Sequence, residues 1–350
     1  MAGFKITPNP KRNPQIMGLK TKLDNLKITT CCPSCGSIRV GEKWPAHRIS
    51  LEKSIFWCSN CGFGWQHPLP SQKEIRDYYE RFTAYNIHGA NEKEKSAIKR
   101  IRRINKLMPN RGHLLDIGSG LGYFLKIAQK DGWKVSGFEP QKSAALFCQD
   151  HLGINVYADS IQNLILESKT FDVVTLWDVW EHVHDPLQFL DQCMSLLSPG
   201  GLMAMAIPNA SGLPAKIFKG QWRYVMKTHL NYFTLPYIHR IFSEKGLEIK
   251  QICHTIKIQS LLQGFASWLP FQIDTEKIIR LGRRGSMEQG RPEQATTKGR
   301  LEKSPAFSTL LGFVRRLLLE VNLTPLPGSY GDILDVYCRR KIRGPLNNRQ

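Results

Sequence analysis

The sequence of 350 residues lacks the long apolar runs of a membrane protein. No continuous apolar stretch reaches the roughly 18 residues of a membrane-spanning helix. The N-terminal segment is polar and basic, with prolines at positions 8, 10 and 14, and it lacks the apolar centre of a signal peptide. These absences predict a cytoplasmic protein without a spanning helix.

Acidic residues are also scarce, because 29 Asp and Glu stand against 49 Lys and Arg and leave a formal net charge of +20. Such an excess predicts an anionic neighbour, whether nucleic acid, an anionic membrane surface or a phosphorylated substrate. Much of the charge lies in residues 93–111, where Ile98, Ile101 and Ile104 recur at near-helical spacing. We interpret this segment as a helix with a solvated basic face, and a partner could bind that same face.

The cysteines do not form the pattern of a disulfide framework. Four of the nine occur as two Cys-x-x-Cys pairs, each followed by glycine, and these are Cys32 with Cys35 and Cys58 with Cys61. Four thiolates at this spacing predict one structural Zn²⁺ in a ribbon, with a strand near residues 48–57. Cys31 is an alternative ligand to Cys32, and a redox-active pair is the competing interpretation. Residues 36–57 are only mildly basic, so we do not expect this ribbon to bind nucleic acid.

A glycine-rich turn at residues 118–122 is the most informative motif. It follows a strand-like run at 113–117 and precedes an amphipathic segment at 123–130. Tyr123 stands where a dinucleotide site needs its third glycine, and no Lys-Ser/Thr pair of a phosphate loop follows. Glu139 ends the next strand-like run and is placed to accept hydrogen bonds from ribose hydroxyls. The motif therefore predicts a cofactor that contains adenosine.

Strand-like and helical segments alternate from residue 111 onward, which predicts an α/β domain with a parallel sheet, helices on both faces and a ligand at the carboxyl ends of the strands. The expected strands are 113–117, 134–138, 155–157, 171–176 and 201–207, and the expected helices are 123–130, 142–151, 160–167 and 186–197.

Five motifs in order resemble those of class I S-adenosylmethionine-dependent methyltransferases, of the subgroup with an N-terminal zinc ribbon that includes ubiquinone-biosynthesis-like and cell-envelope enzymes. The matching segments are Leu115–Gly122, Phe138–Pro140, Ala158–Ser160, Phe171–His182 and Leu197–Gly201. The resemblance covers residues 31–253 and a final strand near 332–340. It implies a Rossmann-like seven-stranded sheet with a small ribbon and a helical C-terminal insertion that interrupts the last hairpin.

The resemblance also implies how S-adenosylmethionine is held. Gly118, Gly120 and Gly122 would let the methionine part of the cofactor lie across the backbone of the turn. Asp116 would lie near the ammonium group of that part. Glu139 would bind the ribose, and Asp178 would lie near the sulfonium and the acceptor. Asp159 would accept a hydrogen bond from the adenine amino group, and the Ser160 amide would bind an adenine ring nitrogen. A helix N-terminal cap is the alternative role for Asp159.

His182 is the candidate general base, because the ordinary pKa of histidine is about 6.5. A structural hydrogen bond at a helix start is its alternative role. His184 and His229 are further candidates, and residues 227–234 resemble a loop that closes over the substrate. The run Asp178-x-x-Glu181-His182 is similar to a divalent-metal cluster of some ubiquinone-pathway enzymes, except that this chain has Asp where that pattern has Glu.

We predict six regions and one main function. The regions are a basic tail (1–28), the ribbon (29–68), a helical linker (69–110), the methyltransferase core (111–253), a helical insertion with a polar linker (254–328), and a last strand with a basic tail (329–350).

The predicted activity is O-methylation of a sugar, glycan or lipid-linked intermediate, with peripheral contact at an anionic membrane surface as an option. The alternatives are a nucleic-acid methyltransferase or nucleic-acid-binding ribbon, and a quinone-type small-molecule O-methyltransferase.

Overall fold

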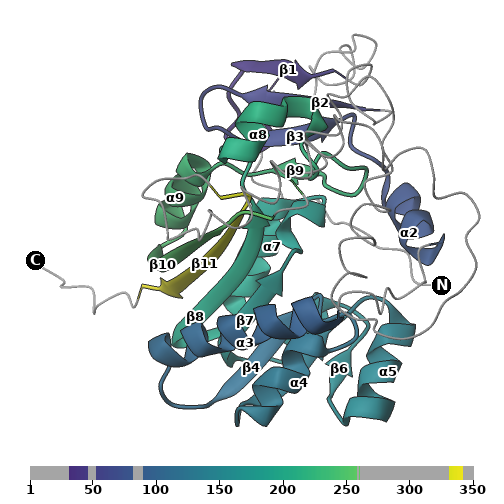
Figure 1. Ribbon diagram of the computed structural model, residues 1–350, viewed down its shortest axis with the longest axis vertical. Coiled ribbons are helices and arrows are strands. Elements are labelled where there is room, and N and C mark those ends of the chain that lie inside the picture. The colour runs from purple at the N-terminus through teal and green to yellow at the C-terminus, as the bar shows by residue number, and fades with distance from the viewer. Residues whose placement is uncertain (1–30, 46–52, 82–89, 258–259, 261–330, 342–350) are drawn as a thin grey trace, which may run out of the picture.

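A mixed seven-stranded sheet forms the centre of the molecule (Figure 1). The computed structural model describes residues 31–45, 53–81, 90–257, 260 and 331–341. The strands follow the order β10-β11-β8-β7-β4-β5-β6. Their bounds are β4 His113–Ile117, β5 Lys134–Phe138, β6 Val156–Tyr157, β7 Phe171–Trp177, β8 Leu197–Pro208, β10 Leu247–Thr255 and β11 Ile333–Arg340.

The prediction of a parallel sheet is confirmed for the strands from β4 to β8, which pair in parallel. At the other edge β11 runs antiparallel to both β8 and β10, as the expected last hairpin requires, so the whole sheet is mixed. The predicted helical insertion and its polar linker lie outside the described residues, apart from 254–257 and Ser260.

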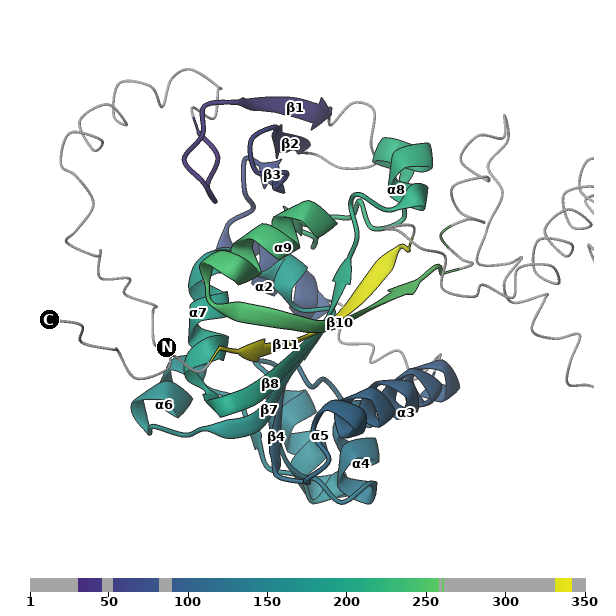
Figure 2. The ribbon, with the colours of Figure 1, turned by 90° about the vertical axis from the view of Figure 1, so that its left-hand side faces the viewer.

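Helices cover both faces of this sheet, as predicted. Buried residues of α3, α4 and α5 pack on one face, and those of α6, α7 and α9 pack on the other, because alternate residues of each strand point to opposite faces (Figure 2). The helices are α2 Gln72–Arg81, α3 Ala90–Leu107, α4 Tyr123–Lys130, α5 Lys142–Leu152, α6 Ile161–Leu166, α7 Pro186–Ser195, α8 Leu213–Phe218 and α9 Leu235–Glu244, with 3₁₀ turns at Trp180–His182 and Lys219–Gln221.

The basic segment at 93–111 is only partly a solvated face. Ile101 and Ile104 are buried in the core as expected, and Lys99 is exposed. Arg100, however, turns inward and pairs with Asp335 of β11 at 3.2 Å. Its side chain is only 15% exposed, so at this residue the interpretation of a solvated face was wrong. The reason is that β11, more than 200 residues later, places a carboxylate beside the helix.

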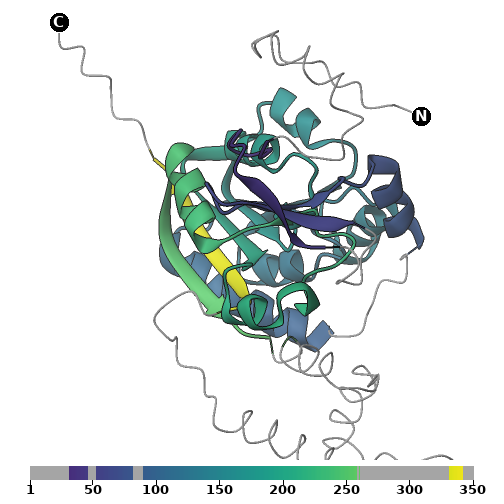
Figure 3. The same cartoon turned by 90° about the horizontal axis from the view of Figure 1, so that it is seen from above.

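The N-terminal residues form a second, four-stranded sheet in the order β1-β2-β3-β9, which lies across one end of the main sheet (Figure 3). Its strands are β1 Val40–Trp44, β2 Ser54–Cys58, β3 Gly64–His67 and β9 Asn231–Tyr232. The strand predicted at 48–57 is confirmed over Ser54–Trp57 by β2, and residues 48–52 of that prediction lie outside the described residues. The fourth strand, β9, comes from the larger domain, so the two sheets are joined.

Within the described residues, no helix is both long and apolar enough to cross a membrane.

Candidate active site and metal centre

The glycine turn after β4 is held in a left-handed conformation. Gly118, Gly120 and Gly122 have φ angles of +74°, +52° and +72°, a region that residues with a Cβ rarely adopt. A Cβ on Gly118 would lie 2.6 Å from Cγ2 of Val179, which follows β7. A Cβ on Gly120 would meet no heavy atom within 4 Å in the part of the chain that the structure describes. The turn therefore packs against the end of β7 and leaves open space above Gly120, which fits a ligand crossing the backbone there.

Glu139 connects the turn after β5 to the glycine turn. One carboxylate oxygen accepts a hydrogen bond from the Gly120 amide at 2.9 Å, and the other accepts from the Gln141 amide at 3.0 Å. The half-buried side chain is thus fixed at the carboxyl ends of β4 and β5. A carboxylate in this position has lone pairs left for two vicinal hydroxyls.

Asp116 lies in β4, and only 2% of it is exposed. Thr175 of β7 donates its hydroxyl hydrogen to the carboxylate at 2.6 Å. Burial raises the pKa of Asp116 to about 7, because a charged carboxylate is costly away from water. Close by, the hydroxyl of Ser119 is buried without a hydrogen-bond partner among the described residues. Both groups fit a polar, cationic ligand at the turn.

Asp159 and Ser160 follow β6, at the same edge of the sheet. Asp159 is exposed, and Ser160 accepts a hydrogen bond from the Gln162 amide at 3.1 Å as the N-cap of α6. The alternative role of Asp159 as the helix cap was therefore wrong, because the hydroxyl of the next residue, Ser160, caps α6 instead. The Asp159 carboxylate remains at the position predicted for adenine.

The segment after β7 carries the other predicted residues. Asp178 is exposed and has a φ of +58°, a strained conformation for a residue with a Cβ. Glu181 is 1% exposed, and neither of its carboxylate oxygens has a hydrogen-bond partner among the described residues. Burial and the nearby Asp178 charge raise the pKa of Glu181 well above its ordinary value. The nearest basic atom given for it is Nε2 of His182, 4.0 Å from Oε1. A buried carboxylate without hydrogen bonds is costly and often marks a functional site.

His182 and His229 lie together beside Glu181. The His182 Nδ1 atom is 2.8 Å from the Thr228 carbonyl oxygen, which can only accept, so Nδ1 carries the hydrogen. The two imidazole rings make an edge-to-face contact with centroids 4.6 Å apart. Burial lowers the pKa of both histidines, which favours neutral rings at pH 7. Nε2 of His182 therefore carries the lone pair that a general base needs.

Glu181, His182 and His229 each place one ligand atom within 4.8 Å of the others. Two imidazoles and a carboxylate suit Zn²⁺ and other divalent transition ions. The grouping differs from the sequence-based hypothesis, which placed Asp178 with Glu181 and His182. His184 lies apart from this group, because its Nε2 contacts the Pro70 carbonyl oxygen at 2.8 Å.

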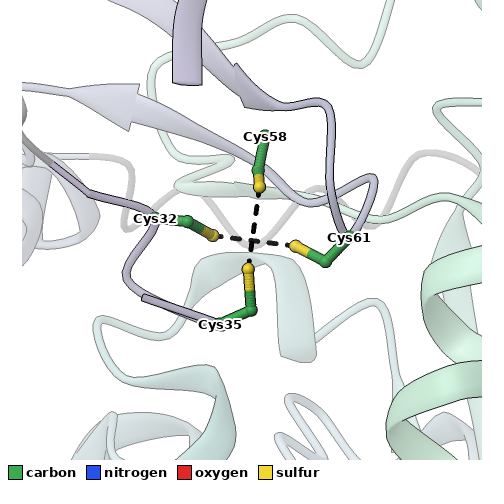
Figure 4. A group of neighbouring side chains, drawn as sticks. All are labelled: Cys32, Cys35, Cys58 and Cys61. Carbon is green, nitrogen blue, oxygen red and sulfur yellow. Dashed lines mark hydrogen bonds between the residues drawn. The ribbon is translucent and has the colours of Figure 1, made fainter. Parts of the chain in front are cut away.

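The four paired cysteines converge on one point (Figure 4). The sulfurs of Cys32 and Cys61 are 3.7 Å apart, as are those of Cys35 and Cys58, and all four lie within 4.8 Å of one another. Four sulfurs about 2.3 Å from a central ion would be about 3.8 Å apart, so the cluster fits tetrahedral Zn²⁺. None of the nine cysteines forms a disulfide in the described residues, so the four sulfurs are available to a metal ion. Zinc in this site would tie the two knuckles of the ribbon together.

Residues 87–252 match a protein-family model described as a methyltransferase domain. The match begins before α3 and ends in β10, so it spans the glycine turn, Glu139 and the residues after β7. The chain contains a methyltransferase domain. Its sheet has the Rossmann-like arrangement expected of class I.

Relatives of this methyltransferase domain carry the name ubiquinone biosynthesis O-methyltransferase. The protein from Coxiella burnetii is 29% identical over 116 residues, which cover 31% of this chain and 50% of that protein. The protein from Nitrobacter winogradskyi is 31% identical over 150 residues, which cover 39% of this chain and 57% of that protein. The chain thus spans about half the length of these curated relatives. A SAM dependent methyltransferase from Archaeoglobus fulgidus is a structural neighbour with a TM-score of 0.43 and 15% identity, covering 70% of this chain and 94% of that one.

Sequence patterns did not identify three residues that contact elements of the candidate active site, and these are Gln66, Arg100 and Thr228. The Arg100 guanidinium lies 4.2 Å from the ring centroid of Trp177, the last residue of β7. The Thr228 carbonyl oxygen sets the tautomer of His182, and Gln66 contacts the same segment from the ribbon. No local signal could have identified them, because their partners lie 46 to 235 residues away along the chain.

Proposed function

We propose that the chain transfers a methyl group from S-adenosylmethionine to a hydroxyl oxygen of a small or lipid-linked acceptor. The main support is the convergence of three loops at one edge of the sheet. The glycine turn contacts Val179 after β7, and its Gly120 amide donates to Glu139 after β5. The name of the relatives, ubiquinone biosynthesis O-methyltransferase, also indicates O-methylation.

The cofactor would be held by the residues of these loops. We assign the ammonium group to Asp116, the methionine part to the open space above Gly120, the ribose to Glu139, and adenine to Asp159 and the Ser160 amide. When bound, the cofactor supplies the methyl group. Because the displacement is in line, the contribution of the chain is to align the reacting atoms and keep water out.

An oxygen acceptor must lose its proton as the bond to the methyl carbon forms. We assign this proton to Nε2 of His182, because Nδ1 is held by the Thr228 carbonyl and the ring is neutral at pH 7. Methyl transfer in this scheme yields the O-methyl product, S-adenosylhomocysteine and a protonated His182. General-base assistance of this kind is typically worth about 10²- to 10⁴-fold in rate.

A second candidate for acceptor activation is a divalent cation at Glu181, His182 and His229. The observation that favours it is the buried Glu181 carboxylate, which accepts no hydrogen bond from the described residues and lies within 4.8 Å of a ligand atom of each histidine. A bound cation would lower the pKa of the acceptor hydroxyl. Methyl transfer that survives EDTA, in protein whose ribbon still holds zinc, would exclude this candidate.

The chemical class of the methyl acceptor is a separate question. The names of the relatives favour a quinone-type phenol. The basic charge and the amphipathic helices expected in the C-terminal insertion instead favour a sugar, glycan or lipid-linked intermediate. Transfer of labelled methyl to separated lipid, glycan, nucleic-acid and small-molecule pools of a cell extract distinguishes them. Label in nucleic acid, with salt-sensitive binding, would instead support the nucleic-acid alternative. Failure of zinc-loaded protein to bind S-adenosylhomocysteine in calorimetry would overturn the proposed activity.

A further inference from the structure

Gln66 of the ribbon binds the chain segment that carries His229. Gln66 is in β3, and only 2% of it is exposed. Its side-chain nitrogen lies within hydrogen-bond distance of three carbonyl oxygens, those of Met226 (2.9 Å), Lys227 (3.1 Å) and His229 (3.0 Å). Its backbone amide donates to the Leu230 carbonyl oxygen at 2.9 Å. One ribbon residue therefore holds the backbone on both sides of Thr228.

This segment in turn orients both imidazoles. Thr228 supplies the carbonyl oxygen that receives the Nδ1 hydrogen of His182, and the ring of His229 packs edge-to-face on that of His182. The Leu230 amide donates to the Glu181 carbonyl oxygen at 2.8 Å, and the Asn231 side chain donates to the Val183 carbonyl oxygen at 2.7 Å. The contacts of Gln66 thus continue without a break to the residues after β7.

The zinc knuckles hold the far end of the same segment. The hydroxyl of Ser34, between Cys32 and Cys35, lies 2.9 Å from the Tyr237 hydroxyl of α9. Thr234 donates to the carbonyl oxygen of Gly62, the residue after Cys61, at 3.0 Å. A Cβ on Gly62 would lie 2.7 Å from the Thr234 hydroxyl oxygen, so the two surfaces fit closely.

We propose that Gln66 is a positioning residue for His182 and His229, and that the zinc ribbon is the fixed support of the acceptor side of the active site. This inference rests on the roles proposed above for the two histidines. The cofactor side has supports of its own outside that segment, since Gly122 packs against Leu152 of α5 and the Gly120 amide donates to Glu139. Loss of the ribbon contacts should therefore disturb the histidines and spare cofactor binding.

The test is Gln66→Met in the full-length, zinc-loaded protein, because methionine keeps the volume of the side chain and removes the amide hydrogens. Gln192→Met is the matched control, since Gln192 is half-buried and its amide donates to the Gln162 side-chain oxygen at 2.8 Å in a solvent-exposed hydrogen bond, away from the histidines. Hydrogen exchange reports on the 226–232 backbone. The ¹⁵N signature of the His182 ring, measured at one pH and assigned with His182→Gln, reports on its tautomer.

We expect the Leu230 amide to exchange at least about tenfold faster in Gln66→Met, a difference of ~1.4 kcal/mol. The His182 signal should change from one tautomer to a mixture, which a merely structural loss elsewhere would not produce. The affinity for S-adenosylhomocysteine should stay within about twofold, and Gln192→Met should match the wild type throughout. Unchanged exchange and an unchanged His182 signature in Gln66→Met would overturn the inference.

A second measurement keeps the test decisive if Gln66→Met fails to fold. Zinc is removed from wild-type protein by graded chelation while metal content, exchange and cofactor affinity are followed. Exchange of residues 226–232 should rise in proportion to zinc loss, with S-adenosylhomocysteine still bound. Full protection of this segment in zinc-free protein would overturn the inference. Lack of S-adenosylhomocysteine binding by intact protein would count against the proposed function instead, and the exchange result would still decide the role of Gln66.

Discussion

Replacement of Gly120 by alanine should separate cofactor binding from stability. Gly120 has a φ of +52°, and a Cβ there would meet no heavy atom of the described residues within 4 Å. The added methyl group would therefore enter the open space that we assign to the methionine part of the cofactor. In the unliganded protein its only cost would be backbone strain.

The size of that strain can be estimated. A left-handed conformation costs a residue with a Cβ about 1–2 kcal/mol. Reduced freedom of the unfolded chain offsets about 0.4–1 kcal/mol of this cost. Gly120→Ala should thus lower the free energy of unfolding by about 1 kcal/mol. Gly153→Ala is the matched control, because Gly153 has a φ of +63° at the end of α5 and open space at its Cβ position.

Urea unfolding without ligand should show that the two variants lose similar amounts of unfolding free energy. Calorimetry with S-adenosylhomocysteine should separate them, with affinity weakened at least about tenfold in Gly120→Ala and changed less than about twofold in Gly153→Ala. Gly122→Ala should be less stable than either, because its Cβ would lie 2.8 Å from Cδ1 of Leu152. Equal affinity of the Gly120 and Gly153 variants would refute the assignment of the turn as the cofactor cradle.

Three other predictions concern charge, metal and catalysis. Because burial raises the pKa of Asp116 to about 7, the carboxylate that would bind an ammonium group forms only as the pH rises through that value. Calorimetry should show S-adenosylhomocysteine affinity increasing between about pH 6 and 8 in the wild type but not in Asp116→Asn. Cys35→Ser should lose the single zinc that elemental analysis is expected to find in the wild type, and full zinc content in the variant would contradict the four-sulfur site. His182→Gln should reduce labelled methyl transfer by about 10²- to 10⁴-fold while cofactor affinity is kept; a rate near that of the wild type would exclude His182 as the base.

Much of the sheet and its helices followed from local sequence patterns. The bounds of β4, β5 and α4 agree with the prediction, because alternating or helical apolar spacing and a left-handed glycine mark where each begins or ends. Prediction was less accurate at β8, which begins at Leu197 and continues through the Pro-Gly-Gly turn. There the pairing with β7 extends a strand across residues of low strand propensity, which only the neighbouring strand can stabilise.

The proposed cofactor residues were predictable for the same reason. Asp116 lies near the end of β4, Glu139 and Asp159 follow β5 and β6, and parallel strands bring their carboxyl ends to one edge. The structure places them at that edge, and their roles stay predictions. The role of the cysteine pairs was equally local, since their spacing alone limits how the thiols can meet.

The sequence by itself determined the five parallel strands of the main sheet, where the glycine turn lies and which cysteines meet. Only the tertiary structure decided that β9 of the larger domain completes the ribbon sheet, that Gln66 binds the His229 segment, and that Arg100 turns inward to Asp335. The physical reason is that these contacts join residues 163 and 235 positions apart, as in the Gln66–His229 and Arg100–Asp335 pairs. Their geometry depends on how whole elements pack, which no local propensity encodes.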